Sequence, residues 1–297
     1  LGLTSGIVLF GVEKGIERFN KILMPLLVVM LVGLGVNSFF MDGFAEGIAF
    51  VLRPDFSKID GGVVFQALGQ AFFSLSIGMG AMTVYGSYVK DGESLPRIAG
   101  TVAVSDVCIA VLSGIAIFPA VFTFGINPTS GPELVFMTLP GIFQQIPGGY
   151  YVSIAFFSIL FMAAITSSVS LVEAIVAWLM EEFRMSRPRA LALATGTIFL
   201  LGTLCAVSQV EGSSLRVLGM DIFDLFDRAS STVLMPVGAV LIVLFAGWVV
   251  DGSTLRGQLT SGGKVARKLF PPLRFMIRYV CAVVIALLFL DQIGLLR

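Results

Sequence analysis

Long apolar runs recur along this chain of 297 residues, and they restrict its fold more than any other feature. Each run has about twenty residues or more, the length that a helix needs to cross a hydrocarbon core of about 30 Å. Hydrophobic residues make up 57% of the chain and charged residues only 13%. This balance excludes an ordinary soluble domain and predicts an all-α membrane protein. The seven candidate spans cover residues 22–41, 63–89, 97–125, 150–181, 188–208, 221–250 and 275–294.

The segment 1–10 is apolar but is only about half as long as a membrane crossing. It begins with Leu1, has no positive n-region and has no small-residue cleavage site, so it is not a signal peptide. We interpret it as the end of a truncated transmembrane helix, and the chain as the C-terminal part of a larger membrane protein. Residues 11–297 then form one seven-span bundle.

Connections rich in Lys and Arg alternate with poorer ones, and cytoplasmic loops carry the excess of these residues. The alternation predicts that residues 11–21 are cytoplasmic and that the C-terminus is extracellular. The 19 basic and 19 acidic residues cancel, so no net charge points to nucleic acid as a partner. The chain has no histidine, which removes imidazole as a base or metal ligand.

The span 63–89 contains the stretch FFSLSIGMG at residues 72–80. Gly78 and Gly80 each weaken a helix by about 1 kcal/mol relative to Ala, and one helical face cannot hold both Ser74 and Ser76. We therefore expect a broken helix, the device with which secondary transporters bind ions and charged solutes in the membrane. Close helix packing through small residues is the alternative.

A small, polar stripe follows the span 150–181 at helical spacing. Adjacent hydroxyls and a carbonyl offer neutral oxygens to a monovalent cation, although the hydroxyls can also bond to carbonyls one turn earlier. The stripe consists of Ala163, Thr166, Ser167, Ser170 and Glu173 or Ala174.

Two of the acidic side chains inside predicted spans are candidates for a functional role. Asp106 costs at least about 2.5 kcal/mol there, so it indicates an ion or proton site, with a hydrogen-bonded structural acid as the alternative. Glu173 is the second acid, and Gln70 is a plausible polar neighbour for either.

Pro25 and Gly15 interrupt the helical pattern near the first span. Proline removes a backbone donor, so this end of the helix can open. The interruption is either a static kink or a hinge for release to the cytoplasm.

The connection 126–149 mixes proline and glycine with apolar residues, so we expect it to fold back onto the spans. It is either a structured loop cap or an extracellular lid. Its apolar residues include Leu134, Val135, Phe136, Leu139, Ile142 and Phe143.

Four motifs, in this order, resemble the neurotransmitter:sodium symporter family, and the nearest resemblance is to bacterial transporters of multiple hydrophobic amino acids. The resemblance implies an inverted-repeat helix bundle of the leucine-transporter type. It places this chain from late helix 4 through helix 11, with helices 1–3 missing. The motifs are GIERFNKILMP (15–25), GQAFFSLSIGMGAMTVYGSYV (69–89), GPELVFMTLPGIFQQIPGG (131–149) and AAITSSVSLVEA (163–174).

The resemblance also implies a substrate pocket and two sodium sites, both completed by the missing helix 1. One sodium site takes Ala163, Thr166 and Ser167; the other takes Ser74 and Asp106, with Ser105 as the one-residue alternative. A carboxylate at Asp106 can replace the chloride that many animal relatives need, so we expect transport without chloride. The pocket residues are Phe73, Ser74, Ser76, Met79, Ser167 and Leu171.

In the family's pattern Asp227 resembles the extracellular gate, with Asp224 as the runner-up, and Tyr88 and Glu181 resemble the cytoplasmic gate. The hinge residues are Gly15, Pro25, Gly78 and Gly80.

The resemblance implies a sodium-coupled symporter that takes up hydrophobic L-amino acids by alternating access across the bacterial cell membrane. Its expected partners are the amino acid, the lipid bilayer and the missing N-terminal helices of the same protein. An intramembrane acid-dependent hydrolase, with Asp106 and Glu173 as an acid pair, is the competing class. Another ion-coupled small-solute transporter and a channel are further alternatives.

Overall fold

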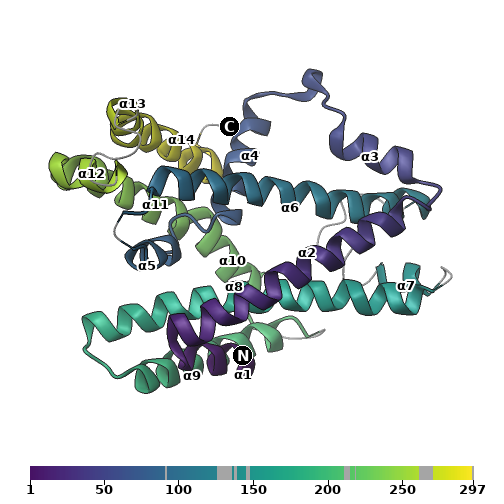
Figure 1. The fold of residues 1–297 in the computed structure, drawn as a ribbon, viewed down its shortest axis with the longest axis horizontal. Helices are drawn as coiled ribbons and strands as arrows, with labels where there is room; N and C mark the ends of the chain where they lie inside the picture. Colours follow the sequence, from purple (N-terminus) through teal and green to yellow (C-terminus); the bar gives the residue numbers. More distant parts are fainter. Residues whose placement is uncertain are drawn as a thin grey trace. The chain divides into compact units, whose positions relative to one another are not determined.

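The computed structural model describes residues 1–90, 92–125, 136, 139–144, 148–210, 215–217, 219–260 and 270–295. These residues are almost all helical (Figure 1). They include one short antiparallel hairpin, in which β1 (Arg216–Val217) pairs with β2 (Met220–Asp221). The chain divides into two compact units. Unit 1 comprises Leu1, Lys58–Ala103 and Ser170–Arg297, and unit 2 comprises Gly2–Ser57 and Val104–Val169.

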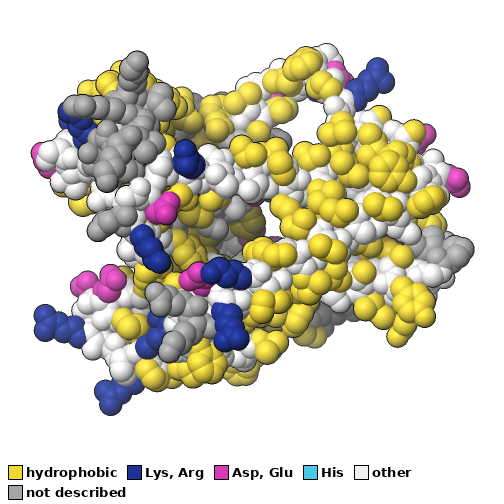
Figure 2. Space-filling view, viewed as in Figure 1, with side chains coloured by type: hydrophobic (Ala, Val, Ile, Leu, Met, Phe, Trp, Pro, Cys, Tyr) yellow, Lys and Arg dark blue, Asp and Glu magenta, His cyan; other side chains and the backbone are white. Residues whose placement is uncertain are grey.

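Within the described residues, six helices are long and apolar enough to cross a membrane. Large apolar side chains remain exposed along them, and Figure 2 shows hydrophobic side chains over much of the visible face. Such a surface suits lipid as the solvent, because lipid tails are as apolar as the side chains. The six spans are Gly15–Ser38, Leu95–Thr123, Gly149–Glu182, Arg187–Ser208, Ile222–Val249 and Phe270–Gln292.

Unit 2 is built around the long helix α2 (Arg18–Ser38), which packs against parts of α6 (Leu95–Thr123) and α8 (Gly149–Glu182). Its core includes Leu27 and Leu31 from α2 and Ile159 and Met162 from α8. Its remaining elements are α1 (Gly2–Leu9), the π-helix η1 (Val12–Glu17), α3 (Phe44–Leu52), the 3-10 turn η2 (Phe56–Lys58) at its boundary, and α7 (Leu139–Phe143).

Unit 1 contains two spans made of several helical pieces. The first joins α10 (Ile222–Arg228), the π-helix η4 (Ala229–Leu234), α11 (Met235–Leu244) and the π-helix η5 (Phe245–Val249). The second joins α13 (Phe270–Phe275), the π-helix η7 (Met276–Cys281) and α14 (Ala282–Gln292), and α11 packs against α14. The other elements of unit 1 are α4 (Gly61–Ser74), α5 (Ala81–Ser87), α9 (Arg187–Ser208) and α12 (Gly252–Leu259), with the ends of α6 and α8.

The segment 63–89 is not a continuous helix. Helix α4 ends at Ser74 and α5 begins at Ala81, so residues 75–80 form an interruption. Both pieces are too short to be spans by themselves, which is why the structure has six long apolar helices where the sequence has seven apolar segments.

Within the connection 126–149, Phe143, the last residue of α7, packs into the core of unit 2. This ring is buried and lies 5.5 Å from the ring of Phe156 on α8. Phe136, in contrast, is exposed. Leu134 and Val135 lie outside the described residues, as do the side chains of Leu139 and Ile142.

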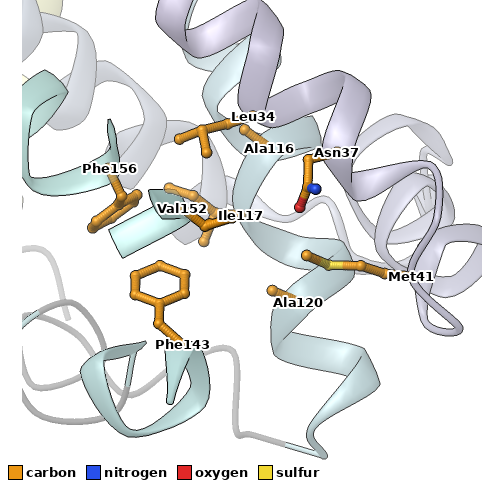
Figure 3. Close-up of a pocket in the computed structure, with 9 residues that line it drawn as sticks. All are labelled: Leu34, Asn37, Met41, Ala116, Ile117, Ala120, Phe143, Val152 and Phe156. Atoms are coloured by element: carbon orange, nitrogen blue, oxygen red, sulfur yellow. The ribbon is translucent and has the colours of Figure 1, made fainter. Parts of the chain in front are cut away.

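A narrow pocket lies beside Phe143, between α2, α6 and α8 (Figure 3). Its volume of about 20 Å³ is enough for about one water molecule, so it is no site for an amino acid. It is lined by Leu34, Asn37, Met41, Ala116, Ile117, Ala120, Phe143, Val152 and Phe156.

Candidate functional site

The interruption between α4 and α5 begins with a Schellman arrangement. The N–H of Ser76 donates to the carbonyl of Phe73 at 3.1 Å, and the N–H of Ile77 donates to the carbonyl of Phe72 at 2.9 Å. Ser76 occupies the left-handed position of this motif with φ of 52°. A side chain in that conformation costs about 1–2 kcal/mol, so the rest of the fold holds the backbone in an unfavourable state.

Backbone carbonyls of the interruption lack backbone hydrogen-bond donors. Among the described residues, no backbone hydrogen bond uses the carbonyls of residues 75–79; the next carbonyl in use is that of Gly80, which accepts from Val84 at 3.1 Å. Gly80 begins α5 with φ of 80°, a conformation that favours glycine. Within a membrane such carbonyls are tolerated where protein or a water-filled cavity covers them.

Four of the predicted substrate residues lie at this interruption. Phe73 and Ser74 are exposed at the last turn of α4, while Ser76 and Met79 are half-buried within the interruption itself. Leu171 is exposed on the part of α8 that belongs to unit 1. Ser167 is exposed on the part of α8 that belongs to unit 2.

The interruption rests directly on α11. A Cβ on Gly78 would lie 2.2 Å from the carbonyl oxygen of Met235, and a Cβ on Gly238 would lie 2.6 Å from the carbonyl oxygen of Gly78. The two backbones therefore meet without a side chain between them, as small residues allow in membrane helices. Gly238 was not predicted from the sequence. Gly238 lies in an apolar span two residues after Pro236, and this position is the feature of the sequence that could have indicated it.

The predicted sodium ligands on α8 lie together in unit 2. Thr166 is buried, and its hydroxyl donates to the carbonyl oxygen of Ala163 at 2.8 Å. This is the bond to the preceding turn that the sequence left open as an alternative. It uses the one hydroxyl hydrogen of Thr166 and brings the two oxygens side by side. Ser167, the next residue, is exposed.

The residues predicted for the other sodium site come from separate elements. Ser74 ends α4 in unit 1. Asp106 is half-buried on α6 in unit 2, and its neighbour Ser105 is exposed.

Glu173 is completely buried in unit 1 and is paired with Arg187, at the start of α9. The guanidinium Nη2 contacts Oε2, and Nη1 donates to Oε1 at 3.2 Å, so the pair is bidentate. The hydroxyl of Tyr88 also donates to Oε1, at 3.1 Å. Both carboxylate oxygens are thus engaged, which argues against Glu173 as the free acid of a hydrolase.

A second tyrosine repeats this contact one turn earlier. The hydroxyl of Tyr85 donates to Oγ of Ser170 at 2.8 Å. Tyr85 and Tyr88 are three residues apart on and just after α5, and Ser170 and Glu173 are three residues apart on α8, so one face of each helix meets the other. The sequence singled out Ser170, Glu173 and Tyr88 but missed Tyr85, for which the three-residue spacing was the available signal.

Arg187 was not predicted from the sequence either. The signal for Arg187 was its position in the first turn of α9, the helix that follows the helix of the buried Glu173.

The predicted gate residues are otherwise exposed. Glu181 lies near the end of α8, and the hydrogen bond of Tyr88 goes to Glu173. Asp227 and its alternative Asp224 are both exposed on α10, where the backbone N–H of Asp224 bonds to the capping side chain of Asp221.

The predicted hinge residues lie at the start of the first span. Gly15 falls in the π-helix η1, and a Cβ on it would lie 2.2 Å from the carbonyl oxygen of Ile7 in α1. Pro25 lies inside α2, where it leaves the carbonyl four residues earlier without its usual partner.

An interrupted apolar segment whose carbonyls lack backbone donors, set among long membrane helices, is the architecture of secondary transporters. The chain belongs to the sodium:neurotransmitter symporter family, whose sequence model matches residues 1–296. The family and the fold are those of secondary transporters and not of enzymes. The resemblance in the sequence and the predicted fold class, an all-α bundle of the leucine-transporter type, are thereby confirmed.

Individual relatives agree with this assignment. An uncharacterized sodium-dependent transporter of Bacillus subtilis, YhdH, is 36% identical over 296 residues, which are 100% of this chain and 66% of the relative. An uncharacterized sodium-dependent transporter of Haemophilus influenzae is 40% identical over 241 residues, 81% of this chain and 53% of the relative. The chain therefore spans less than two thirds of the length of these relatives.

A solved structure shares the fold over nearly the whole chain. The crystal structure of MhsT in complex with L-phenylalanine superposes with a TM-score of 0.85 at 42% identity, covering 98% of this chain and 66% of MhsT.

Proposed function

We propose that the protein containing this chain is a sodium-coupled symporter that takes up hydrophobic L-amino acids by alternating access. The observation that carries the proposal is the interruption between α4 and α5, which offers carbonyls beside Ser74 and Ser76 and has an apolar ring, Phe73, next to them. Carbonyl and hydroxyl oxygens suit the ammonium group of an amino acid, and apolar neighbours suit its side chain.

The comparisons support the two parts of this proposal. Relatives named as sodium-dependent transporters support sodium as the coupling ion. The L-phenylalanine bound to MhsT supports a hydrophobic amino acid as the substrate. Met79 is a flexible side chain at the interruption and would adapt to substrates of several shapes. Ser167 and Leu171 would complete the pocket wall.

Two sodium ions would bind. One would use Ala163, Thr166 and Ser167, and the adjacent oxygens of Ala163 and Thr166 support it. The other would use Ser74 and Asp106. Parts of the protein outside this chain would complete both sites. A carboxylate at Asp106 supplies the negative charge that chloride would otherwise provide, so chloride would not be required.

Alternating access would depend on two gates, one at the cytoplasmic end and one at the extracellular end of the site. The contacts of Tyr88 and Tyr85 with α8 support a cytoplasmic gate at this end of α5, with Glu181 nearby on the surface. Asp227 would act at the extracellular gate. Opening near Gly15 and Pro25 would release sodium to the cytoplasm, and the different affinities of the two states for sodium would couple the ion to the substrate.

The test uses the full-length protein in proteoliposomes. Uptake of radiolabelled L-phenylalanine should be saturable, should require an inward sodium gradient and should return the amino acid unmodified. Unlabelled Trp and Leu should compete, whereas Glu and Lys should not. Replacing chloride with gluconate should leave uptake unchanged.

Other outcomes would contradict the proposal. A chemically altered product would favour the hydrolase, and uptake that does not saturate would favour a channel. Uptake without sodium would indicate another coupling ion.

A further inference from the structure

A second site of interest lies where the π-helices η5 and η7 meet in unit 1. Arg278, in η7, places its guanidinium carbon 4.1 Å from the ring centre of Trp248 in η5. The indole Nε1–H of Trp248 donates to the backbone carbonyl of Arg278 at 3.2 Å. A Cβ on Gly247 would lie 3.0 Å from Cα of Arg278, so the two backbones are in close contact here. The arginine is thus held in place from two directions.

The level of Arg278 in the membrane follows from its own span and from the span of Trp248, which it contacts. The Cα of Arg278 lies eight residues after Phe270, the start of its span, or about 12 Å along the helix axis, and a long arginine side chain can extend from there towards the nearer membrane surface. Trp248, which it contacts, is the penultimate residue of the other span, Ile222–Val249. Tyr279 and Phe275 pack beside the two residues and remain exposed. Exposed Trp and Tyr at span ends mark the headgroup region of a bilayer, so the guanidinium lies at the depth of lipid phosphates.

This arginine lacks an anionic partner among the described residues. Its Nε is buried without a hydrogen-bond partner, and no described carboxylate pairs with it. Stacking on an indole engages the face of the guanidinium, which leaves the N–H groups at its edge for another acceptor.

More positive charge gathers on the same side. Arg274 lies one turn before Arg278, and its guanidinium nitrogens lie 3.1 and 3.2 Å from the place of a Cβ on Gly252, at the start of α12. Arg256 of α12 lies over the ring of Phe270, with 5.8 Å between its guanidinium carbon and the ring centre. The three arginines thus share one end of these helices.

Among the described residues, no carboxylate forms an ion pair with any of the three arginines. The sequence between Asp251 and Asp291 contains Lys and Arg but neither Asp nor Glu. Asp251 itself caps α12, where hydrogen bonds from the side chain and the backbone of Ser253 lower its pKa. Its Oδ2 accepts from both the backbone N–H and the hydroxyl of Ser253.

We propose that Arg274 and Arg278 bind the phosphate of an anionic membrane phospholipid, whose acyl chains lie against the exposed aromatic side chains around Trp248. Charge complementarity carries the choice of occupant, because the bilayer supplies a phosphate at this depth and the described residues supply no acid. A guanidinium holds phosphate oxygens in a bidentate manner, and basic pockets between membrane helices are known to take such headgroups.

The test measures lipid binding to the full-length protein by native mass spectrometry. Dioleoyl phosphatidylglycerol and dioleoyl phosphatidylcholine, which share their acyl chains, are titrated separately. The phosphatidylglycerol adduct should form at lower concentration. Arg278→Gln and Arg274→Gln should each weaken it about fivefold, the factor expected for one basic residue at the membrane surface.

Matched variants separate binding from folding. Arg216→Gln makes the same chemical change at an exposed residue of β1 and should leave both lipids unaffected. Arg278→Lys keeps the charge but loses the bidentate geometry, so it should bind phosphatidylglycerol more weakly than the wild type and more strongly than Arg278→Gln. If Arg278→Gln fails to fold, Arg274→Gln, which is not stacked on Trp248, carries the test.

Two experiments can overturn the proposal, the first through either of two results. In the lipid titration these are equal binding of the two lipids by the wild type, or unchanged phosphatidylglycerol binding in both glutamine variants. The second experiment uses a photo-crosslinking amino acid at position 279: attachment to another segment of the protein instead of lipid would show that protein covers this face.

Discussion

At the scale of single residues, the glycines of the interruption differ in what they permit. Gly78 has both a positive φ, 86°, and no room for a Cβ, because Met235 of α11 is in contact with it. Gly80 has a similar φ, 80°, but open space around its Cα. The two positions therefore separate a steric requirement from a conformational one.

We expect Gly78→Ala to abolish the folded protein or displace α11, since a contact of 2.2 Å cannot be relieved by side-chain movement. Gly80→Ala should cost only the strain of a left-handed residue, about 1–2 kcal/mol, and should give folded protein. The monodisperse fraction in size-exclusion chromatography and the melting temperature of the full-length protein measure the difference. Equal behaviour of the two variants would contradict the close contact with α11.

The pair of Glu173 and Arg187 gives a second prediction at this scale. Removing one member leaves a buried charge without its partner, which costs about 3–5 kcal/mol. Glu173→Gln and Arg187→Gln should each lower the melting temperature strongly, and the double variant should be more stable than the sum of the two losses predicts. Arg189→Gln, an exposed arginine two residues further on, is the control and should have little effect. Strictly additive losses would show that the two side chains do not interact.

At the scale of elements, the sequence was informative where the backbone itself is unusual. The glycines and serines of residues 72–80 predicted an interruption, and the structure ends α4 at Ser74 because Ser76 turns left-handed in a Schellman motif. Contacts between elements were far less predictable. The pairing of Tyr85 with Ser170, and of Glu173 with Arg187, joins residues whose proximity depends on how helices pack, and one sequence does not encode that in any local pattern.

The prediction at the scale of an element concerns the opening of the backbone at the start of the first span. Because Pro25 has no N–H, the carbonyl of Lys21 lacks its helical donor, and backbone around η1 should open readily. Pro25→Ala should slow hydrogen exchange of residues 12–23 severalfold and should lower the rate of transport. Pro188→Ala changes a proline in the first turn of α9, where no donor is missing, and should alter neither. Unchanged exchange in Pro25→Ala would mean that the proline is a static kink.

At the scale of the whole molecule, composition alone predicted a helical membrane protein, and the family assignment confirms its class. The apolar segments predicted from the sequence agree with the six long helices to within several residues at each end, because length and hydropathy determine both. Which helices touch which others does not follow from hydropathy, since in lipid the packing is decided by small residues and polar contacts. Gly238 and Arg278 were therefore missed, although both lie in predicted spans.

The orientation in the membrane is a prediction of the same scale. The distribution of Lys and Arg places residues 11–21 in the cytoplasm and the C-terminus outside. In a full-length variant without its native cysteines, Lys21→Cys should react with a membrane-impermeant maleimide only after the cells are opened. Leu295→Cys should react in intact cells. Both starting residues are exposed. The reverse labelling pattern would contradict the orientation.

The bare contact between Gly78 and Gly238 also bears on how selectivity can evolve. Because no side chain separates the two backbones, a shift of α11 by a fraction of an ångström also moves the peptide oxygens beside Ser76. If the interruption binds the amino acid as proposed, substitutions far along α11 can thus change which amino acid is preferred without altering any residue that touches it.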